Sequence, residues 1–99
     1  MFMDANVPKT TTDLITERGK THGDYSDHAQ CSQNLKYAMQ EFTRGNGLEP
    51  WQHLSICAKE SLEMIAHKIG RILAGDPDYR DHWDDIAGYA KLAADRCSK

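Results

Sequence analysis

Two pairs of acidic residues are the part of this sequence best suited to chemistry. Glu60 and Glu63 form the first pair, and Asp81 with either Asp84 or Asp85 forms the second. Residues three or four apart share one face of an α-helix, so each pair projects two carboxylates in the same direction. Like charges gather only around a cation, and hard carboxylate oxygens suit Mg²⁺ or Mn²⁺. If two such helices face each other, the spacing predicts a divalent-metal site.

The segments that must position these acids have the apolar spacing of helices. Apolar residues recur every three or four positions, which predicts helices over about 13–19, 25–44, 56–74 and 79–96. Glycine-rich breaks at 45–47 and 75–77 separate the three long helices, and no segment alternates like a strand. We therefore predict an all-α fold, a small bundle of three long helices plus a short N-terminal helix. Residues 1–9 are predicted to form a flexible arm, and residues 10–99 a single domain.

Polar residues before each predicted helix favour helix starts rather than catalysis. Residues 10–13, Thr-Thr-Thr-Asp, offer several N-cap candidates for the first helix, and Ser55 is a good N-cap for the third. In the turn His22-Gly23-Asp24, capping of the next helix by Asp24 is favoured over a role of His22 or Asp24 in a site. The last helix is expected to bury a stripe of Trp83 and three alanines, Ala87, Ala90 and Ala94.

Composition limits the classes of function. With 99 residues the chain is small for a self-sufficient core, and such chains recover core area by forming oligomers. A net charge of −3 gives no basic surface, which argues against nucleic-acid binding. The three cysteines show neither a disulfide nor a zinc pattern and fit a reducing compartment. No apolar run approaches the roughly 20 residues of a membrane span, so we expect a cytoplasmic protein.

Helical geometry refines which acids share a face. At about 100° per residue, Glu60, Glu63 and His67 lie opposite the apolar stripe of their helix. In the last helix Asp81 and Asp85 fall together, while Asp84 lies to one side. The geometry favours Asp81 with Asp85, and which of the three aspartates reach a metal stays open. The simpler alternative is that both acidic faces are solvated surface.

Longer runs of residues resemble known proteins. The runs His22-Gly-Asp-Tyr25, Glu60 to Arg71 and Asp81 to Tyr89 resemble a family of small helical proteins encoded by tailed phages and prophages, over about residues 13–96. The pattern Glu-x-x-Glu followed by Asp-x-x-Asp is similar to that of the MazG-like all-α nucleotide pyrophosphohydrolases. That superfamily has Glu-x-x-Asp as its second pair, so this chain departs from it at Asp81.

The resemblance implies a metal-dependent hydrolase of nucleoside triphosphates that releases monophosphate and pyrophosphate. By this resemblance Glu60, Glu63, Asp81 and Asp85 would hold Mg²⁺ or Mn²⁺, with Asp84 as the remaining alternative. Glu60 or Glu63, if spared from the metal, would act as the general base.

Three further residues would contact the nucleotide. Lys68 and Arg71 would bind its phosphates, and Tyr89 would stack on its base. For the two basic residues the alternative is an ion pair with the helices' own acids, such as Arg71 with Asp85.

Two other functions fit the same residues. One is a non-catalytic phage accessory protein in the host cytoplasm that binds a nucleotide or a host protein through the same helical scaffold. The other is a structural helical homo-oligomer, in which the acids form salt bridges with Lys59, Lys68, Arg71 and Arg80.

Overall fold

The computed structural model describes residues 9–99, and within them it contains only helices and loops. The elements are α1 (Thr11–His22), α2 (Tyr25–Glu41), the short 3₁₀ helix η1 (Pro50–His53), α3 (Ile56–Ala74) and α4 (Arg80–Ala94). The predicted all-α fold is confirmed, with three long helices and a shorter first one. Most of the predicted arm, residues 1–8, lies outside the described residues, and Lys9 is exposed and pairs with Glu17.

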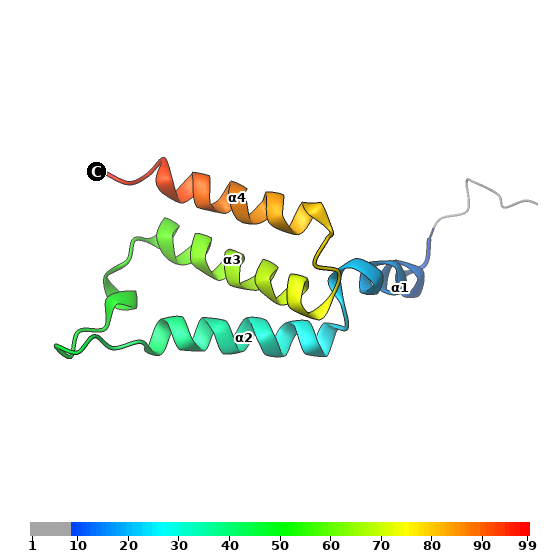
Figure 1. The fold of residues 1–99 in the computed structure, drawn as a ribbon, viewed down its shortest axis with the longest axis horizontal. Coiled ribbons are helices and arrows are strands. Elements are labelled where there is room, and N and C mark those ends of the chain that lie inside the picture. Colours follow the sequence, from blue (N-terminus) through cyan, green and yellow to red (C-terminus); the bar gives the residue numbers. More distant parts are fainter. Residues whose placement is uncertain (1–8) are drawn as a thin grey trace, which may run out of the picture.

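The three long helices form one layer with α3 in the middle (Figure 1). α3 packs against α2 on one side and against α4 on the other, and it runs antiparallel to both. α1 extends from the end of the layer at which α2 and α4 begin. Because α2 and α4 cover two opposite sides of α3, the other two sides of α3 stay uncovered. Any site on α3 is therefore built on one of these two uncovered faces.

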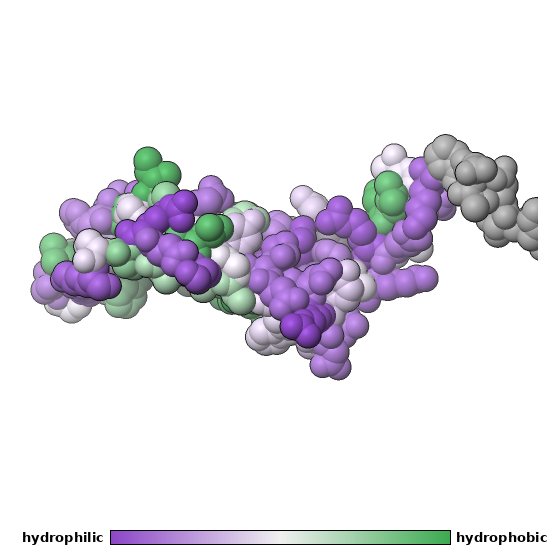
Figure 2. All heavy atoms as spheres, turned by 90° about the horizontal axis from the view of Figure 1, so that it is seen from above, coloured by the Kyte–Doolittle hydropathy of each residue, from purple (hydrophilic) through white to green (hydrophobic). Residues whose placement is uncertain are grey.

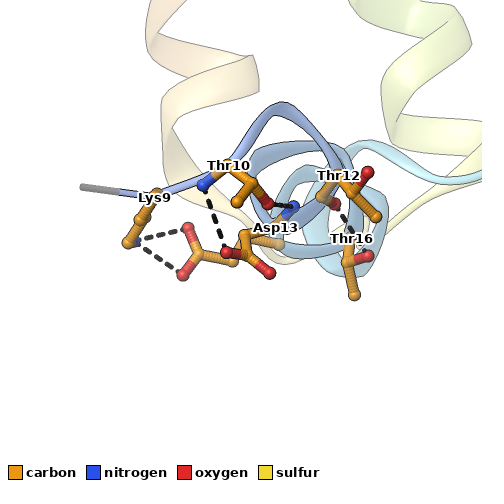
Figure 3. A network of polar contacts seen from close by, with 6 residues as sticks. Lys9, Thr10, Thr12, Asp13 and Thr16 are labelled. Carbon is orange, nitrogen blue, oxygen red and sulfur yellow. Dashed lines mark hydrogen bonds and ion pairs between the residues drawn. The ribbon is translucent and has the colours of Figure 1, made fainter. Parts of the chain in front are cut away.

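The predicted caps at Asp24 and Ser55 are confirmed, and Thr10 is the N-cap of α1 among the four candidates at 10–13. In the capping box of α1, the Thr10 side chain accepts from the Asp13 backbone N–H at 3.0 Å, and the Asp13 carboxylate accepts from the Thr10 N–H at 3.1 Å (Figure 3). The Asp24 side chain caps α2 and the Ser55 side chain caps α3. Because each cap satisfies backbone donors that the first helical turn leaves free, the starts of these helices could be read from sequence.

Two helix lengths differ from the prediction. α1 continues past Gly19 to His22, because the backbone N–H of Gly23 closes the helix onto the Gly19 carbonyl at 3.0 Å. α2 ends at Glu41, before the glycines at 45–47 that were expected to end it.

The predicted buried stripe of α4 is wrong. His82 is the side chain of α4 that the fold buries, at 1% exposed, whereas the neighbouring Trp83 is 54% exposed. The Trp83 indole N–H donates to the Pro77 carbonyl at 2.8 Å, which holds the ring at the α3–α4 turn. Ala87, Ala90 and Ala94 are exposed. α4 is thus rotated relative to the prediction, with a histidine instead of a tryptophan toward α3.

A tight junction joins α1 to the turn between α3 and α4. The carbonyl of Thr21 accepts from the backbone N–H of Asp76 and from Nε2 of His82, each at 3.0 Å. Gly23 has φ +81°, and a Cβ at this residue would lie 2.1 Å from the Ala74 carbonyl oxygen. A Cβ on Gly75 would lie 2.4 Å from the Thr21 carbonyl oxygen. Only glycines allow the two turns to approach this closely.

The described residues enclose few apolar side chains. Ala66 and Ile72 are the buried hydrophobic residues among them, while polar side chains, His28, Ser32, Ser61, Lys68 and His82, are buried beside them. Large apolar residues remain exposed, and Figure 2 shows hydrophobic side chains reaching the surface among hydrophilic ones. Much of the apolar surface of the described layer is therefore in contact with solvent.

The junction generates a prediction about glycine. Gly23→Ala should lower the free energy of unfolding by at least about 2 kcal/mol, because the new Cβ meets backbone atoms and the φ is unfavourable for alanine. The matched control is Gly88→Ala in α4, where a Cβ meets nothing within 4 Å; helix propensity should raise stability by about 0.5–1 kcal/mol. Urea denaturation measures both. Equal stability of the two variants would contradict the described junction.

Candidate functional site

The two glutamates of α3 lie on its polar face without contacting a cation. Glu60 is exposed, and Glu63 accepts a hydrogen bond from the Gln40 side chain of α2 at 3.0 Å. With three-four spacing, His67 and Arg71 continue this face toward the end of the layer that adjoins α1. The predicted separation of this face from the apolar stripe of α3 agrees with these contacts.

The acids of α4 have partners of their own. Asp85 pairs with Nζ of Lys68 on α3 at 2.9 Å, and the Lys68 side chain is only 10% exposed. Asp84 pairs with Arg80 of its own helix at 3.1 Å, on the exposed surface. Asp81 is exposed in the first turn of α4. Of the three aspartates, Asp85 alone reaches across to α3, and a lysine meets it there.

The register of the antiparallel helices keeps the acidic pairs apart. The ion pair of Lys68 with Asp85 sets the register of α3 against α4. Glu63 is five residues from Lys68 in one direction, about 7.5 Å along the axis, and Asp81 is displaced about 6 Å the opposite way. Among residues 9–99, no group of three or more histidine, cysteine or acidic side chains is arranged to hold a metal ion. The expected meeting of four carboxylates does not occur within one chain.

Lys68 therefore has the ion-pair role rather than a free phosphate-binding position. Hydrogen bonding from Lys68 is the main cause that lowers the pKa of the Asp85 carboxyl below its ordinary value. Arg71, expected as the alternative partner of Asp85, makes no ion pair there, and its Nε is buried without a hydrogen-bond partner among the described residues. Tyr89 is half-buried on α4 and lies near enough to Arg71 to be one of the groups that act to raise the pKa of Arg71.

A cavity of about 290 Å³ lies where α1 meets α2 and α3. The basic side chains that line it are Arg18, His22, His28, His67 and Arg71. The rings of His28 and His67 pack edge to face with centroids 4.5 Å apart. Arg71 was predicted as a phosphate ligand; the other four residues were not predicted to form a site. The i, i+4 spacing of Arg18 with His22, and of His67 with Arg71, was the available signal.

Burial and neighbouring positive charge govern the protonation of this cavity. Burial lowers the pKa of His67 to about 4, with His28 and Arg71 acting in the same direction. Burial first, and the positive charge of Arg71 second, also lower the pKa of His22 and of His28. For Arg71, burial and then Arg18 lower the pKa. The histidines are thus held neutral at pH 7 by a site that already contains two guanidinium groups.

Comparison of the chain with protein-family models, with curated proteins and with solved structures found no match. None of the helices over residues 9–99 has the length and apolar character needed to span a membrane.

The Lys68–Asp85 pair generates a prediction with a defined pH dependence. Asp85→Asn should lower the free energy of unfolding by about 1–2 kcal/mol at neutral pH, because Lys68 stays buried without its carboxylate. The folded state lowers the pKa of Asp85 from 3.8, so its contribution is present above about pH 4 and is lost as pH falls through the folded-state pKa. Denaturant titrations at several pH values measure the difference between wild type and variant.

Asp84→Asn is the matched control, since its partner Arg80 is solvent-exposed and such pairs contribute less, about 0.3–0.5 kcal/mol. A cost for Asp84→Asn as large as that for Asp85→Asn would contradict this account. So would a difference between wild type and Asp85→Asn that persists unchanged well below the pKa of an ordinary aspartate.

Proposed function

We propose that the protein is a non-catalytic binding module for a nucleotide, working as a homo-oligomer. The observation that supports this most is the ion pair of Lys68 with Asp85. A metal-dependent hydrolase needs several free acids around one ion. Here the acid that reaches furthest toward α3 is already neutralised by a buried lysine, and freeing it would leave that lysine unpaired at a cost in stability.

Two residues suited to binding a nucleotide, Arg71 and Tyr89, have no ion-pair partner among the described residues, whereas Asp85 has one. Arg71 keeps a guanidinium N–H without a partner among the described residues, and Tyr89 lies near it on α4. Guanidinium groups bind phosphate oxygens with charge-assisted hydrogen bonds. The nucleotide itself is proposed from the resemblance to the MazG-like superfamily. The resemblance to phage proteins adds a host protein as the alternative partner.

Metal-dependent hydrolysis to monophosphate and pyrophosphate is the competing proposal. It is favoured by Glu60 and Glu63, whose carboxylates share the polar face of α3 and pair with no cation. Because one chain brings only these two together, Mg²⁺ or Mn²⁺ would require acids from a second copy or a shift of Asp81 and Asp85. The cost of that rearrangement places this function second.

A second copy of the chain is the proposed occupant of the apolar face of α3. Ala58, Leu62, Ile65, Ile69 and Leu73 recur along this face with helical spacing, and Leu62 and Leu73 are 38% and 71% exposed. The face continues into an apolar hollow at η1, lined among others by Phe42, Trp51 and Leu62. Since two apolar residues alone are buried in the described layer, pairing two such faces would supply the missing core.

Binding without turnover is the first test of the proposed function. Isothermal titration with a panel of nucleoside triphosphates should show saturable binding, and the same mixtures with Mg²⁺ or Mn²⁺ should release no pyrophosphate, because the acids are dispersed. Release of pyrophosphate that disappears in Glu63→Gln, with Gln40→Ala as a neighbouring control, would establish the hydrolase instead. Absence of binding to every nucleotide would overturn both proposals.

Oligomerisation is tested separately. Sedimentation velocity should show a dimer or larger assembly for the wild type, and Leu73→Glu should shift it toward monomer, because a charge on the apolar face opposes its burial. Leu92→Glu is the control, since Leu92 is also about half exposed but lies on α4, away from this face. A wild type that stays monomeric at high concentration, or equal effects of both substitutions, would contradict the proposed interface.

A further inference from the structure

The cavity between α1, α2 and α3 has the composition of an anion site. Two arginines and three histidines line it, and none of the described residues that line it is acidic. The acids of α3 and α4 do not line the cavity. Asp85 is the acid whose charge acts on Arg71, and it forms an ion pair with Lys68. The two guanidinium groups of the cavity are therefore balanced by no acid within its described lining.

Two nitrogen atoms of residues that line this cavity are buried without a hydrogen-bond partner among the described residues. His28 is 6% exposed, and its Nε2 contacts no acceptor among the described residues. The Nε of Arg71 is buried in the same way. Buried polar groups are normally paired, because an unpaired donor forfeits its hydration and receives nothing in return. The Arg71 N–H can only donate, so it lacks an acceptor, and the His28 nitrogen can donate beside it in the tautomer that carries its proton on Nε2.

We propose that this cavity binds a phosphate or pyrophosphate group between Arg18, His28 and Arg71. Guanidinium groups match the oxygens of a phosphate, and they approach here from two different helices, α1 and α3. A volume of about 290 Å³ suits one or two phosphate groups rather than a whole nucleotide. The anion site stands on these contacts alone; its use for a nucleotide rests on the function proposed above.

Side chains, and not a helix end, form this site. The Asp24 carboxylate already accepts from the backbone N–H groups of Ser26 at 2.9 Å and Asp27 at 3.2 Å. The first turn of α2 is therefore capped by its own residue. The binding energy must come from the arginine and histidine side chains, which makes the site testable by substitution.

Tyr25 extends the site toward a base. Its ring lines the cavity, packs edge to face on His28 with centroids 6.3 Å apart, and is 80% exposed. An exposed aromatic ring accepts a stacked base whatever the base's identity. A nucleotide would thus place its phosphates in the cavity and its base on Tyr25, outside it.

Calorimetric titration with inorganic pyrophosphate tests the anion site. Arg18→Gln and Arg71→Gln should each weaken the affinity at least about tenfold, because each removes a charge-assisted contact. Lys20→Gln is the matched control: it removes one positive charge from α1 at an exposed residue that does not line the cavity, and affinity should change less than about twofold. Arg18 is exposed on α1, so its substitution tests the site even where Arg71→Gln impairs folding.

The outcomes separate the site from the proposed function. Pyrophosphate that fails to bind the wild type, or that binds Arg18→Gln and Lys20→Gln equally well, would overturn the anion site. If triphosphates bind Arg18→Gln and Arg71→Gln as tightly as the wild type, the anion site is overturned as the place where a nucleotide binds, and nucleotide binding itself stands. If pyrophosphate binds as predicted but no triphosphate binds, the site stands and the nucleotide function fails. Tyr25→Ala should weaken triphosphate binding and spare pyrophosphate.

Histidine protonation gives a readout that a merely structural role would not move. NMR titration of the His67 ring with and without sulfate, whose charge is constant over this range, should show a pKa well above 4 in the presence of the anion. The charged and titratable residues that line the cavity are Arg18 and His22 of α1, Tyr25 and His28 of α2, and His67 and Arg71 of α3. From outside the lining, Lys36 of α2, Lys68 of α3 and His82, Asp85 and Tyr89 of α4 act on the titration of these groups. An unchanged His67 titration would count against the site.

Discussion

The structure depends on the carbonyl oxygen of Thr21. This single acceptor binds the backbone N–H of Asp76 and the Nε2 of His82, which joins the end of α1 to the α3–α4 turn and to the first turn of α4. A carbonyl can only accept, so His82 carries its proton on Nε2. Because His82 is 1% exposed, the hydrogen bond is shielded from water. Together with the contacts of α1 with α2 and α3, it holds α1 at the end of the layer.

That junction determines where the basic residues meet. Arg18 and His22 lie on the last turns of α1, while His28 and His67 with Arg71 lie on the layer. Gly23 and Gly75 let the two backbones approach until any Cβ would clash, which brings α1 within reach of α3. The cavity is therefore formed by the junction. The packing of the two turns around the Thr21 carbonyl offsets the repulsion between the guanidinium groups of Arg18 and Arg71.

Local rules predicted the helices well and the site poorly. Residues 10–13, Asp24 and Ser55 indicate helix starts in the sequence, because capping depends on residues a few positions apart. The partner of Asp85 depends instead on the register and rotation of α4 against α3. The predicted buried stripe with Trp83 gave the wrong rotation. Tryptophan is the more apolar side chain, yet His82 was buried because its ring could reach the Thr21 carbonyl. No spacing within α4 encodes an acceptor 61 residues away.

The acids are recognisable from their spacing in the sequence, whereas the basic residues form a cluster only in the folded structure. Glu60, Glu63 and the aspartates stand in a recognisable spacing, but helices in a flat layer separate pairs that a closed bundle would bring together. His28 and Arg71 lie 43 positions apart and converge only through the fold. Each has a buried nitrogen without a hydrogen-bond partner among the described residues, whereas the acids are solvated or already paired. Unsatisfied groups, not conspicuous ones, indicate where a ligand completes the molecule.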